Sequence, residues 1–135
     1  PLISEGPFGF QRLNVADQRR DPESLLNWIE RIIRMRKECP QIGWGDFEVL
    51  ETQREVLALR YAWQNTAVVV LHNLSEKPVS VRLRTRDAGH DQLVSLLSHD
   101  HSTARKGRHV VDIDGYAYRW YRVGGLDDIL KRRSW

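Results

Sequence analysis

Hydrophobic residues change their spacing along the chain near Asp46. Before that point, apolar residues recur every three or four positions and predict an amphipathic helix. The apolar stripe consists of Leu25, Trp28, Ile29, Ile32 and Ile33. Asp21 is the expected N-cap, because its carboxylate can accept backbone N–H bonds, and Pro22 suits the first helical position. Pro40 marks the point by which the helix has ended.

From Phe47 onward, apolar and polar residues alternate, as in strands with one buried face. The predicted strands are residues 57–63, 67–71, 79–83, 93–97, 109–113 and 116–123. The unbroken apolar run of residues 67–71 is typical of a central strand. Asp114-Gly115 predicts a hairpin that joins the last two strands. Short strands separated by polar turns indicate an antiparallel β-sandwich, so the predicted fold is mainly β with one preceding helix.

The first 20 residues show no periodicity and are interrupted by prolines and glycines. A loop of this length is uncommon in a complete compact domain, so we expect it to pack against another part of a larger protein. The predicted organisation is a loop and helix over residues 1–45, a sandwich over residues 46–125, and a tail over residues 126–135 that can form a short helix.

Charge and composition exclude several classes of partner. The net charge is +3, and the basic residues are spread over the chain rather than gathered in a stripe, so no nucleic-acid partner is predicted. The longest apolar run, residues 67–71, is far below the roughly 20 residues that cross a bilayer, so no membrane partner is predicted. With Cys39 as the single cysteine and no signal-peptide pattern, a cytoplasmic location is expected.

Six segments, in order, resemble the C-terminal end of α-amylase-superfamily enzymes. The segments are 8–18, 21–28, 33–40, 43–45, 71–75 and 114–123. They are similar to the family's loop after the last barrel strand, the two ends of its eighth barrel helix, the glycine-rich link, and two strand segments of the terminal sandwich. The aromatic-Gly-aromatic-Gln sequence at residues 8–11 and the ending Arg119-Trp120-Tyr121 favour the trehalose synthase branch, which interconverts maltose and trehalose.

This resemblance implies that residues 1–45 are the loop and last helix of a truncated (β/α)₈ barrel. In the family, an aspartate nucleophile, a glutamate acid/base and a stabilising aspartate lie at the carboxyl ends of barrel strands four, five and seven. None of those motifs occurs in this sequence, so no catalytic residue is assigned and the chain alone is expected to be inactive. The implied partners are the barrel domain of its own parent chain and that enzyme's α-glucoside substrate. No cofactor is implied.

Two groups of residues are candidates for contact with sugar. By resemblance, Phe8, Phe10, Gln11 and Asn14 lie on the loop after barrel strand eight. There they either line the rim of the parent enzyme's substrate site or pack locally. Tyr116, Tyr118 and Trp120 share one face of the last predicted strand. Such aromatic rings stack on sugars in a carbohydrate-binding module, which is the alternative function, but the more frequent role of such a strand face is core packing.

Trp44, two histidines and the helix stripe give further expectations. Trp44, between two glycines, is the expected plug between domains. His99 and His101 have the spacing of two ligands on one strand face, but no third ligand has a diagnostic spacing, so no metal site is predicted. The helix stripe within residues 22–37 predicts that the isolated chain either self-associates or folds this helix back onto its own sandwich.

Overall fold

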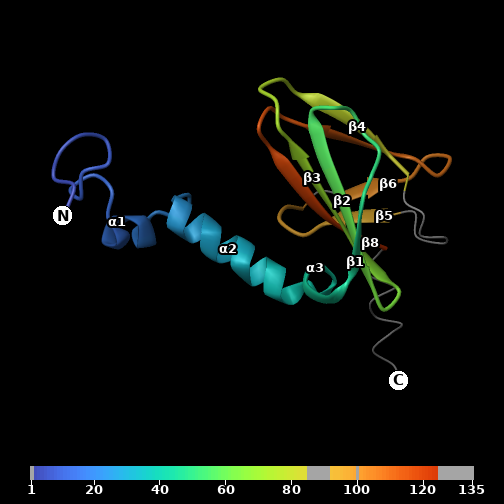
Figure 1. The fold of residues 1–135 in the computed structure, drawn as a ribbon, viewed down its shortest axis with the longest axis horizontal. Helices are drawn as coiled ribbons and strands as arrows, with labels where there is room; N and C mark the ends of the chain where they lie inside the picture. Colours follow the sequence, from blue (N-terminus) through green and yellow to red (C-terminus); the bar gives the residue numbers. More distant parts are fainter. Residues whose placement is uncertain (1, 85–91, 100, 125–135) are drawn as a thin grey trace. The chain divides into compact units, whose positions relative to one another are not determined.

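The computed structural model describes residues 2–84, 92–99 and 101–124 of the chain (Figure 1). It divides the chain into two compact units, Pro1–Glu38 and Cys39–Trp135. The division lies before residue 45, where the sequence places the domain boundary. The reason is that α3, Pro40–Trp44, packs on two strands of the sandwich. The tail over residues 126–135, with its expected helix, lies outside the described residues.

The first unit contains a short helix that the sequence pattern did not predict. Helix α1, Val15–Arg20, lies in the stretch that was expected to be irregular. Asn14 is its N-cap, because the Asn14 side-chain oxygen accepts the backbone N–H of Asp17 at 2.9 Å. The helix is too short to show an apolar repeat, so its cap was the only signal in the sequence.

The second helix, α2, begins later than the sequence predicts. It spans Leu25–Glu38, and Ser24 rather than Asp21 is its cap. The Ser24 hydroxyl oxygen accepts the backbone N–H of Asn27 at 3.3 Å. Asp21 instead ends α1, and its carboxylate accepts the N–H of Glu23 in a local turn at 2.9 Å.

The second unit is an antiparallel β-sandwich, which confirms the predicted fold class (Figure 1). Its strands are β1 (Asp46–Val49), β2 (Val56–Trp63), β3 (Thr66–Asn73), β4 (Val79–Leu83), β5 (Gln92–Ser95), β6 (His101–Thr103), β7 (His109–Ile113) and β8 (Tyr118–Val123). Six of them form one sheet in the order β1-β2-β3-β8-β5-β6, and β4 pairs with β7 in a second sheet. Every pairing between these strands is antiparallel.

The core lies between the two sheets. Strand β3 occupies a central position between β2 and β8, and residues 67–71 are all buried, as the unbroken apolar run predicts. Residues from β2, β3, β4, β5, β7 and β8 face the core, among them Val69, Leu71, Val81, Leu93, Ile113 and Tyr121. The turn between β2 and β3 holds Gln64 and Asn65 at φ values of 47° and 60°, which asparagine tolerates better than most residues.

The predicted hairpin at Asp114-Gly115 is wrong, because β7 and β8 belong to different sheets. Strand β7 pairs with β4, while β8 pairs with β3 and β5. The connection crosses between the sheets and packs against the loop after β3. The N–H of Tyr116 donates to the carbonyl of Ser75 at 2.8 Å, and a Cβ on Gly115 would overlap the carbonyl oxygen of Glu76.

Buried Asn73 joins these two loops. Its side-chain Nδ2 donates to the carbonyl of Lys77 at 2.7 Å and to that of Asp114 at 3.0 Å. Its side-chain oxygen accepts the backbone N–H of Ser75 at 3.0 Å. One amide side chain therefore satisfies backbone groups of both loops, which fixes where the chain crosses from one sheet to the other.

Candidate functional site

The face of the six-stranded sheet that points away from the core is rich in apolar and aromatic residues. We call it the outer face, and from β1, β2, β3 and β8 it contains Phe47, Val49, Leu57, Leu59, Tyr61, Trp63, Val68, Val70, His72, Tyr118 and Trp120. The register places Val70 between Leu59 on β2 and Trp120 on β8. The phenyl ring of Phe47 lies 6.1 Å from the ring of Tyr61. The outer face is thus a second apolar surface on a sheet whose other side already forms the core.

Exposure rises from the centre of the outer face toward the edge strand β1. Val68 and Val70 are buried, whereas Phe47 is 66% exposed and Val49 is 67% exposed. Trp44, two residues before the start of this strand, is 80% exposed. Natural proteins rarely leave large apolar residues on an exposed edge strand, and contiguous apolar surface of this kind is typical of an interface.

Tyr118 and Trp120 lie on the outer face, so core packing in the sandwich does not account for them. Tyr121, which points to the opposite side of β8, supplies the core contact. The Tyr118 ring stacks on the His72 ring with centroids 5.9 Å apart, and burial lowers the pKa of His72 below its ordinary value. The indole N–H of Trp120 is buried and has no hydrogen-bond acceptor among the described residues.

Tyr116 does not share this face. It precedes β8 in the crossing loop, at a φ of 54°, and its ring is exposed. The three aromatic residues that sequence spacing places on one face are therefore two neighbours on the sheet and one separate residue in a turn.

The candidate residues of the first unit lie in and after a tight turn. Phe8 and Phe10 flank buried Gly9 and are themselves exposed. Gln11 is also exposed, while Asn14 is half-buried. The Asn14 side chain is occupied locally, because its Nδ2 donates to the carbonyl of Phe10 at 3.1 Å and to the Asp17 carboxylate at 2.7 Å. The structure thus assigns Asn14 a capping role and leaves the two phenylalanine rings without a packing role inside this loop.

Helix α2 has the predicted apolar stripe, and no residue of the helix is buried. Leu25, Ile29 and Ile33 are exposed, while Trp28 and Ile32 are half-buried. Burying an aliphatic side chain contributes about 1.5–3 kcal/mol, so a stripe of this width is a large unused source of stability.

Within residues 2–84, 92–99 and 101–124, no group of three or more potential ligand side chains can hold a metal ion. Asp100, between the two histidines considered above, lies outside the described residues. No helix in the described part of the chain is long and apolar enough to cross a membrane.

The chain is similar to the C-terminal parts of several known proteins. A family model for the C-terminal domain of sucrose hydrolase-like proteins matches residues 66–122, from the start of β3 into β8. A trehalose synthase of Pimelobacter sp. (strain R48) is 26% identical over 134 residues, which cover 94% of this chain and 23% of that enzyme. The chain resembles the C-terminal portion of α-amylase-family enzymes. It resembles trehalose synthase, as the sequence motifs indicate.

Two further proteins are similar to this chain, one in sequence and one in fold. A trehalose synthase of Thermus thermophilus is 36% identical over 77 residues, which cover 56% of this chain and 8% of that enzyme. The solved structure of an α-amylase from Geobacillus thermoleovorans, complexed with acarbose, has a TM-score of 0.71 at 20% identity and covers 90% of this chain and 27% of its own. The chain therefore spans about a quarter or less of these relatives.

The sequence pattern left the most exposed part of the outer face unassigned. Phe47 and Val49 alternate with Asp46 and Glu48, which is the period-two signal of a half-buried strand, but four residues are too few to distinguish a strand from a loop. Only the pairing of β1 with β2 shows which side of the sheet these two residues occupy.

Proposed function

We propose that this chain stabilises the catalytic barrel of a maltose- and trehalose-converting enzyme, as its C-terminal accessory portion. The single observation that carries the proposal is the outer face, an apolar surface that leaves Phe47 and Val49 exposed on an edge strand. A large protein surface that covered this face would remove these side chains from water and would protect the edge of β1. The exposed stripe of α2 requires the same kind of cover.

The test uses the enzyme that carries this chain. Replacing both Phe47 and Val49 by Ser should lower the temperature of irreversible inactivation by several degrees. The KM for maltose should stay within about twofold, because the proposed contact is remote from chemistry. The matched control is Thr52→Ser and Val110→Ser. Neither residue belongs to the outer face, and Val110 is an exposed β-branched residue on the other sheet.

Two results would contradict this accessory role. The first is an unchanged inactivation temperature in the Phe47 and Val49 variant. The second is conversion of maltose by the purified 135-residue chain, which would require a catalytic group within these residues.

A second candidate function is sugar binding by the aromatic residues of β8. The specific observation is that Tyr118 and Trp120 lie on the outer face rather than in the core, where their rings are partly accessible. Titration of the chain with maltose, trehalose and glycogen tests this function. Millimolar or tighter binding that is lost in Trp120→Ala, with an unchanged circular dichroism spectrum, supports it, and the absence of binding excludes it.

A further inference from the structure

Strand β4 has one edge that pairs with no strand the structure describes, since its sheet contains β4 and β7. We call it the open edge. The Ser80 carbonyl points to the open edge, because the Nε2 of Gln53, in the loop between β1 and β2, donates to it at 2.6 Å. The turn before β7 gives the same assignment. Arg105 and Arg108 exchange backbone hydrogen bonds of 2.8 Å and 3.1 Å, so the backbone groups of Arg108 point away from β4.

These two observations determine which backbone groups of β4 are left for a partner. In an antiparallel pair, successive residues alternate between bonding to the partner strand and pointing away from it. His109 therefore bonds to Leu83. The backbone groups of Val110 and of its registered partner Arg82 point away from each other. The N–H and the carbonyl of Arg82 thus lie at the open edge, and the Gln53 amide shows that a peptide-like group fits there.

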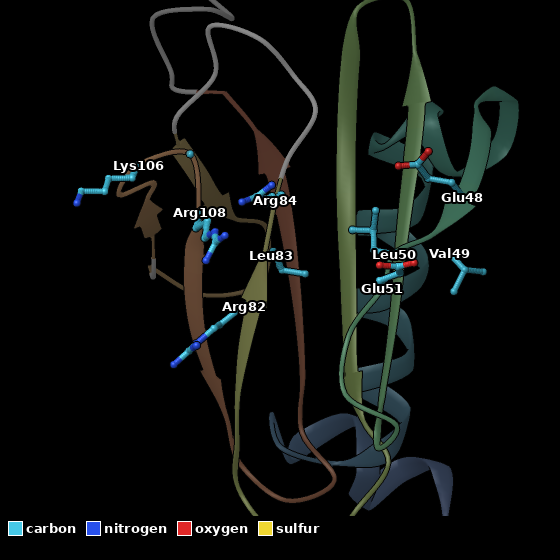
Figure 2. Close-up of a pocket in the computed structure, with 10 residues that line it drawn as sticks. Glu48, Val49, Leu50, Glu51, Arg82, Leu83, Arg84, Lys106 and Arg108 are labelled. Atoms are coloured by element: carbon cyan, nitrogen blue, oxygen red, sulfur yellow. The ribbon is translucent and has the colours of Figure 1, made fainter.

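The two sides of β4 differ in chemistry. Its inner side carries Val81 and Leu83, which are buried in the core. Its outward side carries Arg82 and, directly after the strand, Arg84, and both are exposed. Figure 2 shows Leu83 directed toward the six-stranded sheet and Arg82 directed away from it. Within the described part of the chain, neither arginine forms an ion pair.

Further positive charge lies beside the open edge. The register of β4 and β7, extended by one residue, places Arg108 opposite Arg84, and Lys106 in the same turn is exposed. Like charges on opposing residues destabilise a pair of strands. Asp112 is the only acidic residue in either strand, and its carboxylate accepts a hydrogen bond from the Ser80 hydroxyl. A partner that supplies carboxylates would therefore stabilise this end of the sheet.

We propose that the open edge of β4 binds an extended segment of a separate protein, in which acidic and aliphatic residues alternate. The backbone of the segment pairs with the N–H and the carbonyl of Arg82, as when a peptide adds a strand to a sheet. Its acidic residues lie beside Arg82 and Arg84, because guanidinium groups match carboxylates. Its aliphatic residues lie on the side of Val81 and Leu83, because successive side chains of a strand point to opposite faces.

There is space for such a segment beside β4. A cavity of about 930 Å³ is lined by residues 82–84 and, from the opposite sheet, by residues 48–51. Figure 2 shows Leu50 directed toward this space. Glu48 and Glu51 also line the cavity, so an acidic residue on the inner side of the segment would meet like charge. The cavity thus favours aliphatic residues on the inner side and leaves the acidic residues for the arginines.

Charge and position select among the possible occupants. Two copies of this chain that paired along their open edges would bring their arginines together, which like-charge repulsion opposes. A nucleic acid or an anionic membrane has no peptide backbone to pair with Arg82. The outer face, which the proposed accessory role assigns to the barrel, lies on the other side of the core from β4. The open edge therefore stays accessible in the complete enzyme, and its partner goes beyond the accessory role.

Fluorescence anisotropy with labelled, end-blocked peptides tests the proposal on the 135-residue chain. The probe is Thr-Glu-Val-Glu-Val-Glu-Thr. One comparison peptide, Thr-Lys-Val-Lys-Val-Lys-Thr, has the opposite charge, and the other, Glu-Glu-Thr-Val-Val-Thr-Glu, has the composition of the probe without its alternation. The probe should bind at least about tenfold more tightly than either, a difference of about 1.4 kcal/mol.

Amide hydrogen exchange distinguishes strand pairing from general attraction between charges. Saturation with the probe should slow the exchange of the Arg82 amide by about tenfold or more, because its N–H gains an acceptor. The Val81 amide already bonds to β7, so its exchange should change far less.

Paired substitutions locate the site. Arg82→Gln with Arg84→Gln should weaken binding of the probe by about tenfold or more, because both guanidinium groups that face carboxylates are lost. The control, Arg12→Gln with Arg19→Gln, makes the same change in net charge at two exposed arginines of the first unit and should alter the affinity by less than about twofold. Thermal unfolding of each variant verifies that the sandwich remains folded.

Several outcomes would overturn the proposal. They are absence of probe binding, equal affinities for the probe and the rearranged peptide, equal losses in the two arginine variants, and unchanged exchange of the Arg82 amide in the complex. Equally tight binding of a short oligothymidylate or of phosphatidylserine vesicles would indicate a general anion-binding surface instead. A probe that binds the chain but not the complete enzyme would place the occupant within the parent rather than in a separate protein. None of these results depends on Phe47 and Val49, so they are distinct from a failure of the accessory role.

Discussion

The two units of this chain use apolar residues in different ways. In the sandwich, the inner faces of both sheets meet, and Leu71, Leu83 and Ile113 are almost completely removed from water. In the first unit, α2 has an equally regular apolar stripe, yet none of its residues is buried. The apolar residues of the sandwich therefore stabilise it by packing against one another, whereas those of α2 remain available to a partner. A periodic apolar stripe predicts that one face of an element is buried, but it does not identify the surface that covers this face.

The largest expected effect is a difference in the free energy of unfolding between two isoleucine-to-alanine variants, one in each unit. Ile113→Ala in the core should lower the free energy of unfolding by about 2–5 kcal/mol, because it removes buried methyl groups and leaves a cavity. Ile29→Ala on the exposed stripe should change it by less than about 0.5 kcal/mol. Urea denaturation followed by circular dichroism, at a protein concentration low enough for the chain to be monomeric, measures both. A loss at Ile29 as large as that at Ile113 would break the comparison, since it would show that α2 is already packed in the isolated chain.

Two glycine-to-alanine substitutions compare the packing of the loop between β7 and β8, at Gly115, with that of helix α3, at Gly43. Gly115→Ala should destabilise the chain by about 1–3 kcal/mol, because the new Cβ overlaps the backbone of Glu76 and the loop has to move. Gly43→Ala in α3 meets no atom within 4 Å and should be neutral or stabilising by up to about 1 kcal/mol, since alanine is the better helix former. Thermal unfolding compares the two. Equal stabilities would mean that the contact between the crossing loop and Glu76 is not part of the native fold.

Sequence patterns predicted those parts of the fold that local periodicity determines. Residues 67–71 form the central strand, and residues 25–38 form a helix with the expected stripe. The prediction failed where the pairing of a strand depends on a partner that is distant in the sequence. Asp114-Gly115 suits a hairpin, yet β7 pairs with β4 because Val81, Val111 and Ile113 together complete the core. A dipeptide contains no information about that distant partner.

The candidate sites show the same limit. Spacing grouped Tyr118 with Trp120 correctly, because both lie on one regular strand, but it added Tyr116, which precedes the strand. The cavity lined by Glu48 and Arg84 could not be found from sequence, because it forms only where the two sheets pack together. The side of the sheet on which Phe47 and Val49 lie could not be predicted either. It depends on how β1 pairs with β2, and an alternation of only four residues does not determine that pairing.

The exposed stripe also leads to a prediction about association. The purified chain should self-associate through residues 22–37, and Ile29→Ser with Ile33→Ser should weaken that association by about tenfold or more, because both side chains contribute apolar area. Light scattering over a concentration series measures the effect. Glu30→Gln with Arg34→Gln is the control, since it removes only an exposed ion pair of 3.0 Å on the polar face. A molecular mass that stays monomeric at every concentration would exclude self-association, and slow amide exchange over residues 25–36 in that monomer would indicate that the helix has folded back.

The smallest expected effect concerns His72 on the outer face. Burial lowers its pKa in the folded state, so the folded chain binds a proton there less readily than the unfolded chain does. The stability contributed by neutral His72 is complete above the unfolded pKa of about 6.5 and is lost as the pH falls from there toward the lower folded pKa. His72→Phe retains a ring for Tyr118 to stack on and removes the titration, so its stability should decline less between pH values of about 7 and 5. Urea midpoints at the two pH values measure this decline, and an equal decline in both proteins would show that the His72 environment does not couple folding to pH. If a partner covers the outer face in the complete enzyme, burial of His72 increases, and the same comparison made there should give a larger difference.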